Sequence, residues 1–142
     1  MNAKVVGGLK QSIQASFAAI DSFCAQIKKI LIDADLDKHN YEVQLLLREA
    51  LTNAVQHGCR CDSAKTIECE FLIEQNMFII VVSDDGDGFD WKAASEKEVD
   101  TESTSGRGLN ILKIYANDII FNQKGNKIII KRNIQRGEES NA

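Results

Sequence analysis

Three polar side chains that could bind a ligand or take part in catalysis recur at four-residue intervals in the segment LLLREALTNAVQHG, residues 45–58. They are Glu49, Asn53 and His57, a carboxylate, an amide and an imidazole. Residues four apart lie on the same face of an α-helix, so the three side chains could reach a common ligand. The same spacing also fits the hydrogen-bonded polar edge of an ordinary amphipathic helix. The segment therefore suggests a site only if other parts of the chain support it.

A second group follows a run of apolar residues in VVSDDGDGFD, residues 81–90. Asp84 could accept a hydrogen bond from a ligand amino group, and Gly86 and Gly88 would let a ligand approach the main chain closely. Asp-Gly is also a common turn dipeptide, so a plain turn is the simpler alternative. A calcium loop is excluded, because counting from Ser83 places Ala94 where the twelfth position requires a bidentate Glu.

A third group lies in STSGRGLNIL, residues 103–112, where Gly106, Arg107, Gly108 and Leu109 precede a predicted helix. Backbone N–H groups at the start of a helix bind anions, and an Arg adds a charge-assisted contact. The segment is not a Walker A loop, because the G-K-[ST] element is missing. It also lacks the preceding strand that a dinucleotide-binding fingerprint requires.

Helical periodicity covers two long segments in the first part of the chain. Apolar residues spaced three and four apart over residues 9–35 predict a long amphipathic helix. A second helix is predicted over about residues 38–57, with N-cap candidates in Asp35-Leu36-Asp37 and an end at Gly58. Helical spacing returns near residues 109–115, after an irregular stretch from residue 84 to 105.

Strand patterns fill most of the remaining chain. They cover Thr66–Glu74, Met77–Ser83, Ile119–Asn122 and Lys127–Asn133. The link Gln75-Asn76 predicts a hairpin between the first two strands, and Lys124-Gly125-Asn126 predicts a turn between the last two. Hairpins and helices segregated in this way favour helices on one face of a mixed or antiparallel sheet.

Composition narrows the class of protein. The chain has 142 residues, of which 44% are hydrophobic and 27% charged, as expected for one globular domain with its own core. The net charge of −4 argues against a nucleic-acid partner. The apolar runs are too short to span a bilayer and the N-terminus has no signal-peptide pattern, so we expect a cytoplasmic protein with no membrane partner.

The four cysteines agree with a reducing compartment, because Cys24, Cys59, Cys61 and Cys69 form no C-x-x-C pair. Cys59 and Cys61, with His57 nearby, could form a metal site. Structural zinc sites normally use C-x₂₋₄-C with a second ligand pair, so reduced thiols are the favoured interpretation.

The three groups together carry more information than any one of them. E-x-x-x-N-A-x-x-H, then D-x-G-x-G, then G-x-G-L resembles the N, G1 and G2 boxes of the histidine-kinase-like (GHKL) ATPase superfamily. The resemblance covers about residues 10–134, and the form EALTNAVQHG is most similar to anti-sigma-factor serine/threonine kinases. It implies an α+β two-layer sandwich, the Bergerat ATP-binding fold, with helices on one face of a mixed, mostly antiparallel sheet. It also implies one domain over residues 1–142, with a frayed tail over 135–142.

The resemblance assigns roles to individual residues. Asn53 would bind Mg²⁺ that bridges the phosphates of ATP, and Glu49 would be the general base. Asp84 would accept a hydrogen bond from the adenine amine, with Gly86 and Gly88 shaping the pocket. Phosphoryl transfer needs little beyond a metal, a base and correct positioning, so this set would suffice.

The remaining matches concern the phosphate side of the site. The segment Gly106, Arg107, Gly108 and Leu109 would wrap the phosphates, and residues 91–105 would form the ATP lid. His57 matches the last position of the N box, where a contact on the phosphate side of the cofactor and a structural role are equally favoured.

The chain departs from the family pattern in two places. Family members begin with an edge strand, for which only residues 3–6 could serve here, so we expect that strand to be short or absent. The extra acids Asp85, Asp87 and Asp90 would crowd the nucleotide site or face solvent, and solvent is favoured.

The leading functional hypothesis is a cytoplasmic serine/threonine kinase that phosphorylates an antagonist protein and sequesters a sigma factor or similar regulator. A homodimer is implied by the resemblance alone. The main alternative is an ATP-dependent regulatory binding module with little phosphotransfer. A histidine-kinase catalytic domain acting in trans and a nucleotide-free structural protein remain as further alternatives.

Overall fold

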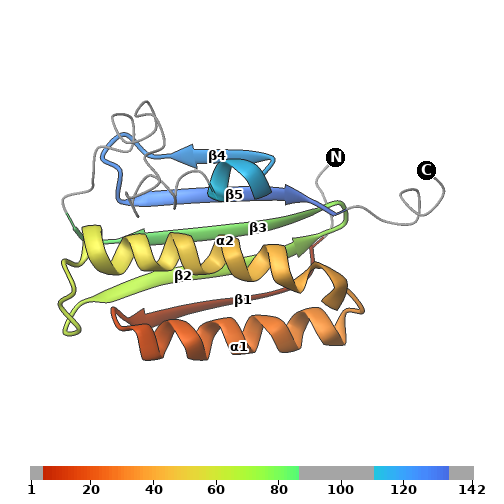
Figure 1. Ribbon diagram of the computed structural model, residues 1–142, viewed down its shortest axis with the longest axis horizontal. Helices are drawn as coiled ribbons and strands as arrows, with labels where there is room; N and C mark the ends of the chain where they lie inside the picture. The colour runs from red at the N-terminus through yellow and green to blue at the C-terminus, as the bar shows by residue number, and fades with distance from the viewer. Residues whose placement is uncertain (1–4, 87–110, 135–142) are drawn as a thin grey trace.

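A computed structural model describes residues 5–86 and 111–134 of the chain. Its strands form one sheet in the order β1-β2-β3-β5-β4, and helices α1 and α2 pack in front of it (Figure 1). Every strand pairing in the described sheet is antiparallel. The predicted α+β two-layer sandwich is therefore confirmed, and the described sheet is antiparallel rather than mixed.

The chain begins with a long strand, not with the predicted helix. β1 covers Val5–Gln14 and α1 covers Phe17–Asp33, so the prediction of a helix from residue 9 and of a short or absent edge strand was wrong. Residues spaced four apart fit a strand as well as a helix, and pairing with β2 along the whole strand decides between them. Ser16 separates the two elements, because its side chain accepts a hydrogen bond from the N–H of Ala19 and caps α1.

The second helix consists of three consecutive segments that differ in helix type. A 3₁₀ turn, η1, covers Asp37–His39, α2 covers Asn40–Asn53, and a π-helical turn, η2, covers Ala54–Gly58. The N-caps predicted in Asp35-Leu36-Asp37 are not found, because η1 and α2 begin without a side-chain cap. The end at Gly58 is confirmed.

The strands after α2 agree closely with the sequence patterns. β2 covers Thr66–Glu74, β3 covers Met77–Asp84, β4 covers Asp118–Phe121 and β5 covers Lys127–Asn133. The register pairs Glu74 with Met77, which confirms the two-residue hairpin. Residues 111–115 are helical, as the spacing there predicted, and precede β4. The predicted lid and the tail lie outside the described residues.

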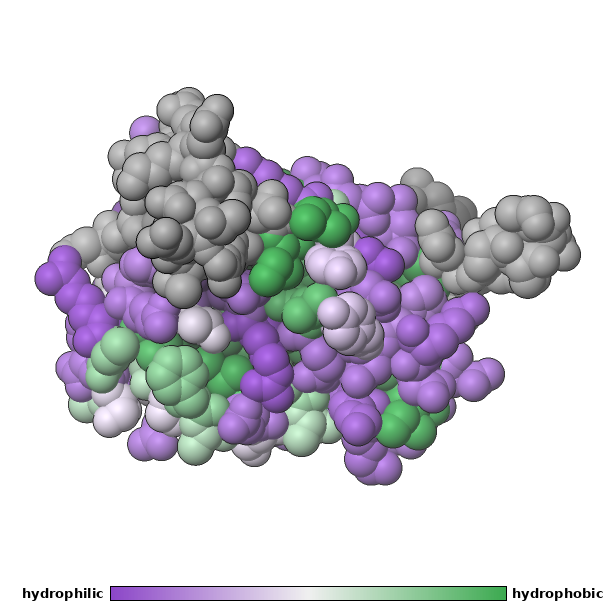
Figure 2. All heavy atoms as spheres, viewed as in Figure 1, coloured by the Kyte–Doolittle hydropathy of each residue, from purple (hydrophilic) through white to green (hydrophobic). Residues whose placement is uncertain are grey.

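The core lies between the sheet and the helices. Alternate residues of β2 and β3 point into it, and α1 and α2 contribute one buried stripe each. Its largest fully buried side chains include Phe23, Phe71, Phe78, Leu46, Leu47 and Leu51. The outer side of the helical layer is mostly hydrophilic, with smaller hydrophobic areas between the helices (Figure 2). Within the described residues no helix is long and apolar enough to cross a membrane.

Candidate functional site

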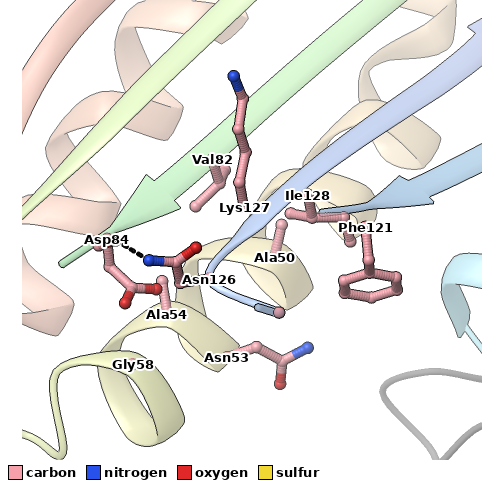
Figure 3. A pocket seen from close by; sticks show the side chains of 11 residues that line it. Ala50, Asn53, Ala54, Gly58, Val82, Asp84, Phe121, Asn126, Lys127 and Ile128 are labelled. Atoms are coloured by element: carbon pink, nitrogen blue, oxygen red, sulfur yellow. Dashed lines mark hydrogen bonds between the residues drawn. The ribbon is translucent and has the colours of Figure 1, made fainter. Parts of the chain in front are cut away.

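A cavity opens where the end of α2 meets the ends of β3 and β5. Its apolar wall comes from the helix on one side and from the strands on the other: Ala50, Ala54, Val82, Phe121 and Ile128. Its polar lining consists of Asn53, Asp84, Asn126 and Lys127, and Gly58 and Gly125 complete it. In Figure 3 Asp84 and Asn126 lie at one side of this space and Phe121 at the other, with Asn53 below them.

The polar end of the cavity depends on close contact between Asp84 and Gly58. A Cβ at position 58 would occupy the space of the Asp84 carboxyl group, so a glycine is needed for the carboxylate to lie against η2. A Cβ on Gly86 would likewise collide with the carbonyl of Gly58. The two glycines together allow the end of β3 to approach the π-helical turn.

The Asp84 carboxylate is held in place but keeps acceptor capacity. Its Oδ1 accepts a hydrogen bond from the backbone N–H of Gly86 at 2.7 Å. No described residue donates a hydrogen bond to Oδ2. Burial raises the pKa of Asp84, against the lowering effect of the Gly86 hydrogen bond. A partly desolvated carboxylate with a free acceptor atom can bind an amino group of a ligand.

The helix side of the site differs from the sequence prediction in one respect. Glu49 and Asn53 are one α-helical turn apart on α2, as expected, and both are half-buried. His57 lies in the π-helical turn η2 and not in the α-helix that was predicted to continue to residue 57. The backbone hydrogen bonds of a π-helical turn join residues five apart in place of four. Of the three, only Asn53 lines the cavity among the described residues.

Glu49 occupies an environment suited to accepting a proton. Desolvation by burial raises the pKa of its carboxyl group, and no other cause contributes. A carboxylate with a raised pKa is a stronger base than an exposed one, which is a common property of catalytic acids and bases.

Several predicted site residues cannot be placed. Gly88, Gly106, Arg107, Gly108 and Leu109 lie outside the described residues. So do Asp87 and Asp90 of the extra acids, whereas Asp85 is exposed. Within residues 5–86 and 111–134, no three His, Cys, Asp or Glu side chains are grouped so that they could hold a metal ion.

Two important residues of the site were missed at the sequence level. Gly58 was predicted only as a helix end, and Asn126 only as part of a turn. Asn126 donates hydrogen bonds to main-chain carbonyls, a role that leaves no spacing motif. Gly58 directly follows the E-x-x-x-N-A-x-x-H pattern, and this position was the one signal for it. Its role becomes visible only when the structure shows that the Asp84 carboxyl group packs against it.

Comparison with known proteins identifies the family. The model of the histidine kinase-like ATPase domain matches residues 13–132, most of the chain. The chain belongs to the histidine kinase-like ATPase family. The match runs from the end of β1 into β5, so it covers both helices, strands β2 to β4 and the cavity.

Known relatives of this histidine kinase-like ATPase domain include anti-sigma F factors and a serine-protein kinase. An anti-sigma F factor of Clostridium perfringens is 26% identical over 133 residues, covering 87% of this chain and 91% of that protein. An anti-sigma F factor of Geobacillus kaustophilus is 26% identical over 137 residues, covering 90% of each. The serine-protein kinase RsbW of Bacillus licheniformis is 28% identical over 86 residues, covering 55% of this chain and 54% of that kinase. The resemblance to anti-sigma-factor kinases is thereby confirmed.

The residues of the cavity are compatible with an ATP molecule. The Oδ2 of Asp84, to which none of residues 5–86 and 111–134 donates a hydrogen bond, suits an exocyclic amine, and the apolar walls from the helix and the strands suit a planar ring. Asn53 lies apart from Asp84 in Figure 3, where it could reach a polar part of the same ligand. Membership in a family of ATPase domains implies ATP binding.

Proposed function

We propose that the protein is an ATP-dependent serine/threonine kinase of the anti-sigma-factor type. It would phosphorylate an antagonist protein and bind a sigma factor or a similar regulator, in the cytoplasm. The observation that carries the proposal is the arrangement of Asp84, Asn53 and Glu49. They provide an amine acceptor at one end of a cavity, an amide on its wall, and a base of raised pKa one helical turn away.

Each residue would have a separate task in this reaction. Asp84 would hold the adenine amine, and Asn53 would hold Mg²⁺, which shields the charge of the phosphates. Glu49 would take the proton of the acceptor hydroxyl while the oxygen of that hydroxyl bonds to the γ-phosphorus. The bond between that phosphorus and the β–γ bridging oxygen would break, and ADP would leave with the electron pair.

Residues outside the described structure complete the proposal. Residues 91–105 would close over the nucleotide as a lid, and Gly106, Arg107, Gly108 and Leu109 would contact the phosphates. Gly88 would shape the adenine pocket beside Gly86. His57 would serve the phosphate side or the structure of η2. We further propose that residues 1–142 act as one domain, and that the protein dimerises as the resemblance implies.

The experiment that tests the kinase uses γ-labelled ATP, Mg²⁺ and partners captured from the source organism's lysate. We expect label on a serine or threonine of one partner, stable to acid and lost with Glu49→Gln. Label that is lost in acid would indicate phosphohistidine and so a phosphorelay role.

One observation favours a second candidate, an ATP-dependent binding switch with little phosphotransfer. Among the described residues Glu49 does not line the cavity, although Asn53 does. Partner binding that depends on ATP and is unchanged by Glu49→Ala would support the switch over the kinase.

A further inference from the structure

Asn126, in the turn between β4 and β5, contacts the end of β3. Its Nδ2 donates to the carbonyl of Asp84 at 3.0 Å and to the carbonyl of Gly86 at 3.4 Å. Its own backbone carbonyl accepts a hydrogen bond from the N–H of Asp84 at 3.0 Å. Asn126 therefore binds both main-chain polar groups of the residue whose carboxylate points into the cavity (Figure 3).

The orientation of the Asn126 amide is itself fixed by Asn122. The Oδ1 of Asn122 accepts hydrogen bonds from three successive backbone N–H groups, those of Gly125 at 2.8 Å, Asn126 at 3.0 Å and Lys127 at 3.1 Å. This leaves its Nδ2 to donate to the Oδ1 of Asn126 at 2.7 Å. Gly125 makes the tight turn possible with its φ of 83°.

This chain of hydrogen bonds permits only one orientation for each amide. Rotation of the Asn126 amide by 180° would place its oxygen against the carbonyls of Asp84 and Gly86 and its nitrogen against the nitrogen of Asn122. Rotation of Asn122 would leave three backbone donors facing an NH₂ group. The donor of Asn126 is thus directed at the main chain of Asp84.

We propose that Asn126 is a positioning residue for purine recognition. By holding the N–H and the carbonyl of Asp84, it fixes the direction in which the carboxylate leaves the main chain toward the ligand amine. A hydrogen bond to a charged acceptor weakens steeply when its angle changes, so a small rotation of Asp84 reduces selectivity for an amino-purine. The inference rests on the proposed function, in which Asp84 binds the adenine amine.

The test is selectivity between two purine nucleotides, measured as the ratio of the dissociation constants for ITP and ATP. ITP has a carbonyl oxygen where ATP has the amine, so a fixed carboxylate disfavours it. For Asn126→Ala we expect the ratio to fall about tenfold, which corresponds to roughly 1.4 kcal/mol. Asn117→Ala is the matched control, because Asn117 is exposed, lies before β4 outside the cavity lining and caps the backbone N–H of Asn133 at 2.7 Å.

A second variant protects the test against a folding defect. Asn126→Asp keeps the side-chain shape and the acceptor for Asn122 but cannot donate to the carbonyls, so its ratio should fall as well. Equal weakening of ATP and ITP, with the ratio unchanged, would show that Asn126 only stabilises the turn and would overturn the inference. Wild-type protein that binds neither nucleotide would overturn the proposed function and the inference together.

Discussion

The carboxyl group of Asp84 lies against Gly58, in the space that a Cβ at position 58 would occupy. This contact joins the last residue of β3 to the π-helical turn after α2, and Asp84 and Asn53 line the same cavity beside it. Because the contact requires both Gly58 and Asp84, a substitution at Gly58 can move the Asp84 carboxyl group while Asp84 itself is unchanged.

Gly58→Ala should weaken ATP binding with little effect on folding. Gly58 has no positive φ, so alanine is compatible with its backbone, but the added methyl group displaces the Asp84 carboxylate. Loss of one hydrogen bond to a charged group corresponds to about 1.5–3 kcal/mol, or roughly 10- to 150-fold in affinity. Calorimetric titration and thermal melting measure the two effects.

Gly7→Ala is the matched control for this substitution. A Cβ at Gly7 would meet its nearest atom, Cδ1 of Ile73, only at 4.0 Å, so it fits without displacement. We expect wild-type ATP affinity for Gly7→Ala. Equal affinity of Gly58→Ala and wild type would contradict the role given to the contact.

Glu49→Gln should abolish most phosphotransfer while leaving ATP bound. General base catalysis contributes about 10²- to 10⁴-fold, so the rate should fall within that range. The measurement is single-turnover transfer from labelled ATP, with the dissociation constant determined in parallel. A parallel loss of affinity would assign Glu49 to binding instead.

The same substitution should change the pH dependence of stability. Burial raises the pKa of Glu49, so its ionised form destabilises the folded state. Wild type and Glu49→Gln should melt alike below the ordinary carboxyl pKa of 4.5. As the pH rises through the raised pKa, wild type loses stability relative to the variant, which should melt higher at neutral pH.

Melting curves at a series of pH values test this sign. Glu68→Gln, at an exposed carboxylate of β2, is the control for the loss of one negative charge. A Glu49→Gln protein that melts below wild type at neutral pH would show that ionised Glu49 has a stabilising partner.

Thiol reactivity tests the packing of the core. Burial raises the pKa of Cys24 to about 11 and that of Cys69 to about 12, and it also raises the pKa of Cys59. Cys61 is exposed. Iodoacetamide at mildly alkaline pH should therefore modify Cys61 first in the native protein and all four thiols in urea, as mass spectrometry would show. Early modification of Cys24 or Cys69 would mean that the core opens readily.

Much of the fold was predictable because its signals are local. The alternation in β2, the apolar run of β3 and the glycine turn before β5 each specify their element. β1 was missed because Leu9 and Ile13 are four residues apart, a spacing that fits both a helix and a strand. Pairing with β2, which lies far along the chain, decides for a strand. Ser16, a residue type that often caps helices, was the local signal that could have placed the start of α1 at residue 17.

The site was predictable where a side chain itself contacts the cavity. Asp84 and Asn53 belong to spaced motifs, and both line the cavity. Asn126 acts through main-chain carbonyls, and the π-helical turn at Ala54–Gly58 lies against the end of β3. Neither has a sequence pattern, since both arise from contacts between distant segments.

Titration of the protein with Mg·ATP, beside its Asp84→Asn variant, tests the central claim most directly. The variant keeps the side-chain shape but replaces one acceptor oxygen with a donor, which would face the adenine amine. We predict saturable binding to wild type and a loss of roughly 10- to 150-fold in the variant, from a charged hydrogen bond of about 1.5–3 kcal/mol. Equal binding to both proteins, or no binding to wild type at millimolar ATP, would contradict the assignment of this cavity as the ATP site.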